Sequence, residues 1–169
     1  MIQEFLVLVL VPAALIAAAG WDLASFTIPN FIQGVLLVGF AIFAVATSMT
    51  LGVLGWHLLA AGIGFALGFT LFALGVVGGG DAKLFACVSL WFGLSNLLDF
   101  AIFASLFGGV LTLALLAFRK LPMPGLLARQ NWLLRLHDNK AGIPYGVALA
   151  SGAFAVLPYT EVFRAATTG

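Results

Sequence analysis

The chain contains a long apolar stretch, LFACVSLWFGLSNLLDFAIFASLFGGVLTLALLAF, at residues 84–118. Its one charged residue is Asp99, and this pattern predicts two membrane-spanning helices, Leu84–Leu98 and Phe100–Phe118. Over the whole chain 63% of the residues are hydrophobic and 8% are charged, whereas an average soluble domain has roughly 25% charged residues. So few polar groups cannot cover a soluble fold, and the apolar residues come in runs of spanning length. These features favour a membrane protein over a very apolar soluble or secreted lipid-binding domain.

Working outward from this stretch, four more apolar runs have nearly the length of a membrane span. They are Phe5–Gly20, Phe31–Thr50, Trp56–Val77 and Ile143–Tyr159. We therefore predict an all-α, polytopic membrane protein of about six transmembrane helices that forms a single domain over residues 1–169. The first and fourth spans are short, and we expect the neighbouring residues Trp21–Ser25 and Gly78–Lys83 to supply the missing turns.

The first apolar run has one feature of a secretory signal peptide. Small residues at Ala17, Ala18 and Ala19 resemble a cleavage site. However, the residues before the run include Glu4 and no Lys or Arg, which is the reverse of the basic start of a signal peptide. We therefore expect this run to remain in the membrane as the first span.

The positive residues predict the orientation of the chain. Five of the seven Lys and Arg residues lie between the last two spans, in a loop at about residues 119–142: Arg119, Lys120, Arg129, Arg135 and Lys140. The positive-inside rule makes this loop cytoplasmic. Counting spans backwards places the junctions that carry Asp81 and Asp22 on the same cytoplasmic face, and it places the N-terminus outside the cytoplasm.

Within this loop, leucines and Trp132 mix with Arg129 and Arg135 at roughly helical spacing between Gly125 and His137. The pattern is typical of a helix that lies among lipid headgroups, attracted to anionic lipid. A role in contacting substrate is the alternative.

Two aspartates at membrane edges are the candidate chemical centre. An ionisable side chain at membrane depth is costly and usually lies in a wet cavity or a bundle interior, where it serves a function. Asp22 ends the first span and precedes Ile28-Pro29-Asn30, where a proline can open the next helix. Asp81 follows three glycines, Gly78, Gly79 and Gly80, which permit the close approach of another backbone. The alternative interpretation makes each aspartate a helix cap or a turn residue.

Two carboxyl groups that face each other across a water molecule can hydrolyse a peptide. One acts as a base toward water while the other, which holds a shared proton, protonates the carbonyl or the leaving amine. The glycine run does not indicate a phosphate site, because a P-loop has Lys followed by Ser or Thr after its last glycine and this chain has Asp81. A bare backbone beside the acid could instead pair with an extended substrate strand.

The sequence predicts no metal centre and no cofactor. The chain has one cysteine, Cys87, so neither an internal disulfide nor a cysteine-rich zinc site can form. His57 and His137 lie in different segments and have no ligand partner at metal-binding spacing.

Three motifs, in order, resemble those of a known family. Gly78-Gly79-Gly80-Asp81-Ala82-Lys83-Leu84 is similar to the G-x-G-D-x-K-L signature of type IV prepilin peptidases, membrane aspartyl proteases of the GxGD class. Asp22 followed by Ile28-Pro29-Asn30 resembles the first catalytic aspartate of that family with its downstream I-P-N. Gly142-Ile143-Pro144-Tyr145-Gly146 resembles the last-helix element of the family. The resemblance covers most of the chain, from Asp22 to about Ala150.

The resemblance implies that Asp22 and Asp81 are the catalytic pair. It also implies that Gly78, Gly79, Gly80, Lys83, Pro29 and Asn30 bind substrate or shape the site. The implied substrate is a prepilin or pseudopilin, whose leader is cut at the cytoplasmic edge of the bacterial inner membrane, just before the hydrophobic helix of the pilin. For Lys83, an ion pair with a carboxylate or a lipid phosphate is an equal alternative to substrate binding. Membrane lipid is the other expected partner, and no nucleic acid is expected.

The chain also departs from the longer members of that family. Those members carry a cytoplasmic insertion with paired, zinc-binding cysteines linked to N-methylation of the mature pilin, and this chain has no such cysteine pairs. The chain therefore resembles the short, peptidase-only form of Flp/Tad pilus systems, without methyltransferase activity. Between Asp22 and Pro29 it also lacks the basic residues that many relatives carry, which argues against a charged clamp there.

Two other functional classes compete with the peptidase hypothesis. In a transporter or channel subunit, the aspartates would relay protons or bind a cation, but such sites usually lie near the bilayer midplane and these aspartates lie at its edge. In a structural subunit of a secretion machine, both aspartates would be caps, and their replacement would leave function intact.

Overall fold

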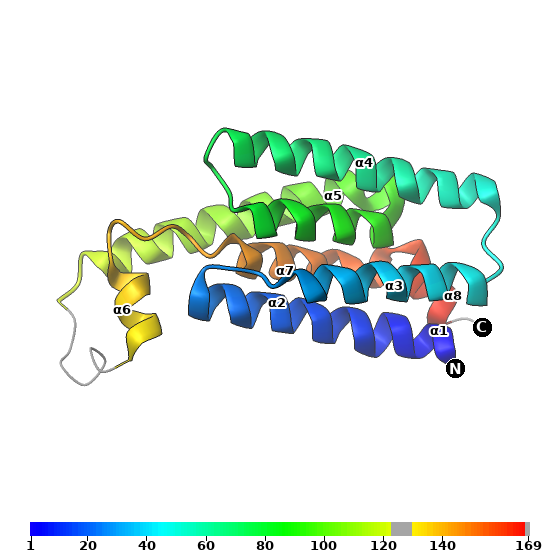
Figure 1. Cartoon of the computed structure of the whole chain (residues 1–169), viewed down its shortest axis with the longest axis horizontal. Coiled ribbons are helices and arrows are strands. Elements are labelled where there is room, and N and C mark those ends of the chain that lie inside the picture. Colours follow the sequence, from blue (N-terminus) through cyan, green and yellow to red (C-terminus); the bar gives the residue numbers. More distant parts are fainter. Residues whose placement is uncertain (123–129, 168–169) are drawn as a thin grey trace.

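The computed structural model describes residues 1–122 and 130–167, and these residues form helices joined by short connections, without a strand. Figure 1 shows the long helices running roughly parallel or antiparallel along one long axis, whereas the short helix α6 (Asn131–His137) lies across it at one end. In chain order they are α1 (Ile2–Phe5), the π-helical turn η1 (Leu6–Leu10), α2 (Val11–Ser25), α3 (Asn30–Ala46), α4 (Leu51–Ala73), α5 (Gly79–Arg119), α6 (Asn131–His137), α7 (Tyr145–Val156), the 3₁₀ turn η3 (Leu157–Tyr159) and α8 (Glu161–Thr167). The all-α class predicted from the sequence is confirmed.

Three helical segments of the described residues are long and apolar enough to cross a membrane. They are Ile2–Ser25, Leu51–Ala73 and Gly79–Arg119, and a fourth is possible if the bent pair Tyr145–Tyr159 and Glu161–Thr167 forms one span. The chain is therefore a polytopic membrane protein, but the predicted number of six spans is not confirmed by this measure. The first segment does include Trp21–Ser25, as expected from the shortness of its apolar run.

Helix α5 is two helical arms joined at a break. The break lies at Gly93, whose φ of 70° and ψ of 178° are not helical. In Figure 1 the chain reverses direction within α5, so that the second arm runs back past the first. The boundary predicted at Asp99 was therefore wrong by about two turns, because a glycine with positive φ, rather than the charged residue, allows the chain to turn.

His57, on α4, packs at this break. Its side chain is 3% exposed, and its Nδ1 lies 2.7 Å from the Leu90 carbonyl oxygen, just before Gly93. A helical break leaves backbone carbonyls without their usual partners, and a ring nitrogen can satisfy one of them. His57 thus has a structural partner in the bundle.

The buried core lies where the first arm of α5 packs between its neighbouring helices. Trp91 is 1% exposed and donates its indole N–H to the Leu36 carbonyl oxygen at 3.0 Å, which links α5 to α3. The rings of Phe40 and Phe43 contact the same indole, with centroids 5.5 and 5.6 Å away. This arm, which begins at Gly79, therefore has a well-defined position relative to the start of α3.

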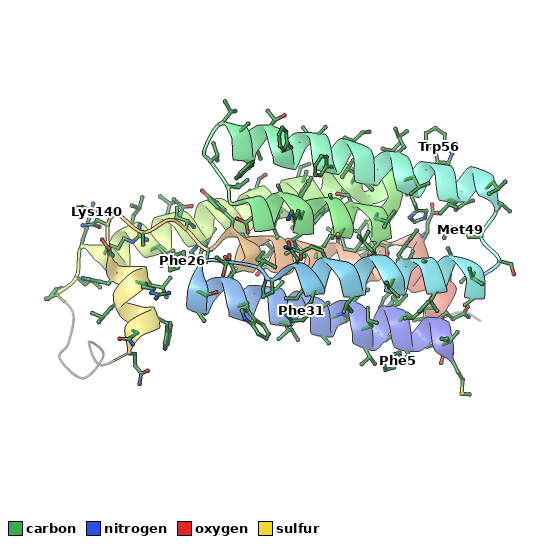
Figure 2. The ribbon with its side chains drawn as sticks, in the orientation of Figure 1. Phe5, Phe26, Phe31, Met49, Trp56 and Lys140 are labelled. Atoms are coloured by element: carbon green, nitrogen blue, oxygen red, sulfur yellow. The ribbon has the colours of Figure 1, made fainter. Side chains whose placement is uncertain are left out.

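The two ends of the bundle carry different parts of the chain. Figure 1 places both termini at one end and α6 at the other, and Figure 2 shows Phe26 and Lys140 near the α6 end and Met49 and Trp56 near the opposite end. Helix α6 covers only the last part of the helix predicted between Gly125 and His137, because residues 123–129 lie outside the described part of the chain.

Candidate active site

Asp22 lies in the last turn of α2 and is 3% exposed. The helix ends after Ser25 because Phe26 adopts a left-handed conformation, with φ of 56°, and donates its N–H to the Asp22 carbonyl oxygen at 2.8 Å. The Asp22 carboxyl accepts a hydrogen bond from the backbone N–H of Gly146, in the first turn of α7, at 2.6 Å. The first and last motifs of the sequence therefore meet at this carboxyl.

Asp81 lies in the first turn of α5 and is 7% exposed. Its Oδ2 accepts the N–H of Gly78 at 2.9 Å, so the carboxyl does cap the helix. Its Oδ1, however, is buried and has no hydrogen-bond partner among the described residues. A buried carboxylate oxygen without a partner is costly in a cap, so the capping role does not account for the whole side chain.

The two aspartates line one cavity of about 220 Å³. Its other lining residues come from the turn after α2 and from the glycine run: Phe26, Thr27, Ile28, Asn30, Gly78, Gly79 and Gly80. The two carboxyls are close enough to interact electrostatically. The tertiary structure therefore brings together two acids from separate helices around a small space, as sharing a proton requires.

The glycine run allows the backbones around this cavity to approach closely. A Cβ atom on Gly80 would lie 3.1 Å from the Cβ and 3.2 Å from the backbone nitrogen of Ile28. A Cβ on Gly79 would meet only the ring of Phe72, at 3.5 Å, which is an ordinary contact. Gly80 is thus the member of the run at which a side chain would push the turn after α2 away from α5.

Of the remaining sequence-predicted site residues, Asn30 lines the cavity, whereas Pro29 and Lys83 do not. Pro29 is the N-cap of α3, with extended backbone geometry, and Asn30 is the first residue of that helix. The Asn30 Oδ1 accepts a hydrogen bond from the ammonium group of Lys83 at 2.9 Å. Lys83 therefore joins the start of α3 to the start of α5, a structural contact that neither alternative from the sequence included.

The described residues contain no group of three or more His, Cys, Asp or Glu side chains that could hold a metal ion. Cys87 is buried as a free thiol, and His137 packs edge-on against the ring of Phe118 with centroids 5.2 Å apart.

Sequence reasoning assigned no role to two residues that organise the site. One is Gly146, where a Cβ would lie 2.9 Å from both Cβ and Oδ2 of Asp22, so only glycine fits. The feature of the sequence that could have indicated this role of Gly146 is the motif Gly142–Gly146. The other is Arg119, whose guanidinium donates to the carbonyl oxygens of Leu136, Ala141 and Gly142 at 2.8, 3.1 and 2.8 Å. These bonds hold the chain that leads into α7, and no local pattern around Arg119 indicated them.

Comparison with known proteins gives one match. No curated protein and no solved structure matches the chain. The model of the type IV leader peptidase family matches residues 9–113, a range that contains both aspartates and the glycine run. The match covers more than half of the sequence, and it agrees with the resemblance seen in the motifs. The chain is therefore a membrane-bound peptidase that belongs to the type IV leader peptidase family.

Proposed function

We propose that this protein is an aspartyl endopeptidase in which Asp22 and Asp81 are the catalytic residues. The observation that carries the proposal is the shared cavity, into which two separate helices bring buried carboxyl groups. Each carboxyl accepts one backbone N–H, and Asp81 Oδ1 has no partner among the described residues, so it is available to a water molecule or a substrate.

The chemistry requires one shared proton. The ionised carboxyl takes a proton from water as the water oxygen attacks the scissile carbonyl carbon, and the protonated carboxyl gives its proton to the carbonyl oxygen. When the tetrahedral intermediate collapses, the C–N bond breaks and the leaving nitrogen takes a proton from a carboxyl. Backbone N–H donors from Gly78 and Gly146 hold the acids in position, which places them before the substrate arrives.

The substrate we propose is the leader of a prepilin or pseudopilin, cut just before its own apolar helix. The family match supports leader cleavage as the general activity. The end of the bundle that holds the aspartates also carries the basic loop, with Arg119, Lys120, Arg135 and Lys140, so the positive-inside rule supports cleavage at the cytoplasmic face of the inner membrane. The lack of paired cysteines supports a peptidase-only enzyme of the Flp/Tad type, without N-methylation.

The test is cleavage of a co-expressed Flp-type prepilin by the wild type and by Asp22→Asn and Asp81→Asn. Each variant should lose cleavage while remaining folded in the membrane, since the change removes an ionisable group and almost no volume. Asp99→Asn is the matched control, because Asp99 is exposed and lies outside the cavity. Chelators should leave the rate unchanged, since the two carboxyls carry out both proton transfers.

Substantial cleavage by either cavity variant would contradict the two-acid mechanism. No cleavage of several prepilins by folded wild-type protein would instead favour the transporter or structural-subunit hypothesis.

A further inference from the structure

A second, larger cavity lies among the membrane-spanning helices and has Asp81 in its lining. Its volume is about 610 Å³, within the range of ligand-binding sites, and α4, both arms of α5, and α7 line it. Asp81 is the one charged residue among the described residues that line it, and Asp81 also lines the smaller cavity that contains Asp22. The two cavities therefore adjoin at a proposed catalytic acid.

The larger cavity, which we call the α4–α5 groove, is apolar in character. The hydroxyl groups of Ser105 and Thr112 donate to carbonyl oxygens of their own helix, those of Ala101 and Gly108, each at 2.7 Å. These hydroxyls are thus already satisfied. The Oδ1 atom of Asp81, on a side chain that is 7% exposed, is buried and without a partner in the described structure.

The second arm of α5 presents a row of small residues to the groove. Ala101, Ser105, Gly108 and Thr112 are spaced by three or four residues, so they share one face of the helix. Gly108 contacts Tyr145 and Ala148 of α7, but a Cβ on the neighbouring Gly109 would meet nothing within 4 Å. Contacts within this chain therefore do not explain why Gly109, which also lines the groove, lacks a side chain, and small residues are typical where another helix approaches closely in a membrane.

We infer that the α4–α5 groove binds the apolar helical segment of the substrate that follows the scissile bond. This inference rests on the proposed function, in which the leader is cut just before such a helix. The lining from Ala101 to Leu113 is about 18 Å long at 1.5 Å per residue, and it passes the level of Asp81 near Ser105, since Asp81 and Ser105 are each twelve residues from the break at Gly93. The first turns of the segment after the cut would therefore lie in the part of the groove on the Gly93 side of this level. An apolar substrate helix needs an apolar groove. The peptide bonds at the start of that helix also need to lie beside a catalytic acid, and Asp81 lines the groove.

The first test compares two substrates, a full prepilin and a peptide that ends a few residues after the cut. Ala101→Leu fills the groove on the Gly93 side of Asp81, because Ala101 is eight residues from the break and Asp81 is twelve, a difference of about 6 Å at 1.5 Å per residue. It should raise KM for the full prepilin by about tenfold, as overpacking of one contact position does, and leave cleavage of the short peptide unchanged. Gly62→Leu is the matched control, because a side chain there meets nothing within 4 Å and lies outside the groove.

The second test is photo-crosslinking from α4 in an Asp22→Asn background, which should hold the substrate uncleaved. A photoreactive residue at Leu67, which is 49% exposed and lines the groove, should crosslink to the segment after the cut. The same group at Leu58, which is 56% exposed and does not line the groove, should not.

The outcomes separate this inference from the proposed function. Cleavage that persists in Asp22→Asn contradicts the catalytic pair itself. If wild type cleaves and Asp22→Asn does not, but Ala101→Leu affects both substrates equally or neither, the groove does not bind the segment after the cut. Crosslinks from Leu67 to lipid alone would likewise overturn the inference.

Discussion

At the scale of single residues, the structure reconciles two interpretations of the aspartates that the sequence left as alternatives. Asp81 caps the start of α5 through Oδ2 and has a second oxygen with no partner among the described residues, so one side chain can both cap a helix and act on a substrate. Asp22 is buried at a helix end and is bound by an amide from the opposite end of the sequence. The hydrogen bonds to the backbone therefore hold the two carboxyl groups in position, and they leave these groups able to act as catalytic acids.

Gly146 provides a sharp test of this arrangement. We expect Gly146→Ala to lower kcat by about a hundredfold, because a methyl group 2.9 Å from Asp22 Oδ2 must displace the carboxyl, and small displacements of catalytic groups have effects of this size. Gly142→Ala is the matched control, since a Cβ there meets nothing within 4 Å. Equal rates for the two variants, measured by prepilin processing, would contradict the role of Gly146.

The glycine run can be tested in the same way. Gly80→Val should abolish or strongly reduce cleavage, because its side chain would collide with the backbone of Ile28 and separate the turn after α2 from Asp81. Gly79→Val should retain most activity, since a side chain there meets the movable ring of Phe72. Processing rates and the membrane yield of both variants check the prediction, and a similar loss in both would indicate that the run serves another purpose.

At the scale of the helices, the break in α5 decides how the site is built. An unbroken helix of this length would continue beyond the membrane, whereas the reversal at Gly93 returns the chain to the end of the bundle that holds Asp81. The second arm can then supply one wall of the α4–α5 groove, and its last residue, Arg119, can bind the chain that leads into α7.

Gly93→Ala should therefore destabilise the fold. A residue with a side chain pays about 1–3 kcal/mol for this combination of φ and ψ, which almost only glycine adopts, and the new Cβ would also lie 3.2 Å from the His57 ring. We expect a lower unfolding temperature in detergent. Gly55→Ala should be neutral or slightly stabilising, because Gly55 lies in the second turn of α4 and a Cβ there would meet nothing within 4 Å. An unchanged Tm for Gly93→Ala would mean that the break does not depend on glycine.

At the scale of the whole molecule, the end of α2 that carries Asp22 and the start of α5 that carries Asp81 lie toward the end of the bundle where α6 lies, and α1 and α8 lie at the other end. The chain passes along the bundle once, through α2, before Asp22 and three times, through α2, α3 and α4, before Asp81. An odd number of passages brings both aspartates to the end opposite the N-terminus. This arrangement lets a single feature of the sequence, the distribution of Lys and Arg, predict on which side of the membrane the chemistry takes place.

The orientation can be checked by labelling single cysteines in a Cys87→Ser background. A membrane-impermeant thiol reagent added to intact cells should label Leu51→Cys, which is 86% exposed at the end opposite the loop. Lys140→Cys, in the basic loop, should react only after the membrane is permeabilised. The reverse pattern would place the aspartates outside the cytoplasm and would contradict cleavage at the cytoplasmic face.

The sequence by itself determined the fold class, the membrane location, the family and the pair of aspartates as candidate residues. These properties depend on local features, namely apolar runs of spanning length, charges at their edges and short motifs, so they can be recognised without knowing how the helices pack. The tertiary structure alone decided that α5 reverses at Gly93, that Gly146 binds Asp22, that Lys83 binds Asn30 and that Asp81 lines the α4–α5 groove. Each of these depends on contacts between residues far apart in the chain, and such contacts are set by the packing of whole helices rather than by any local pattern.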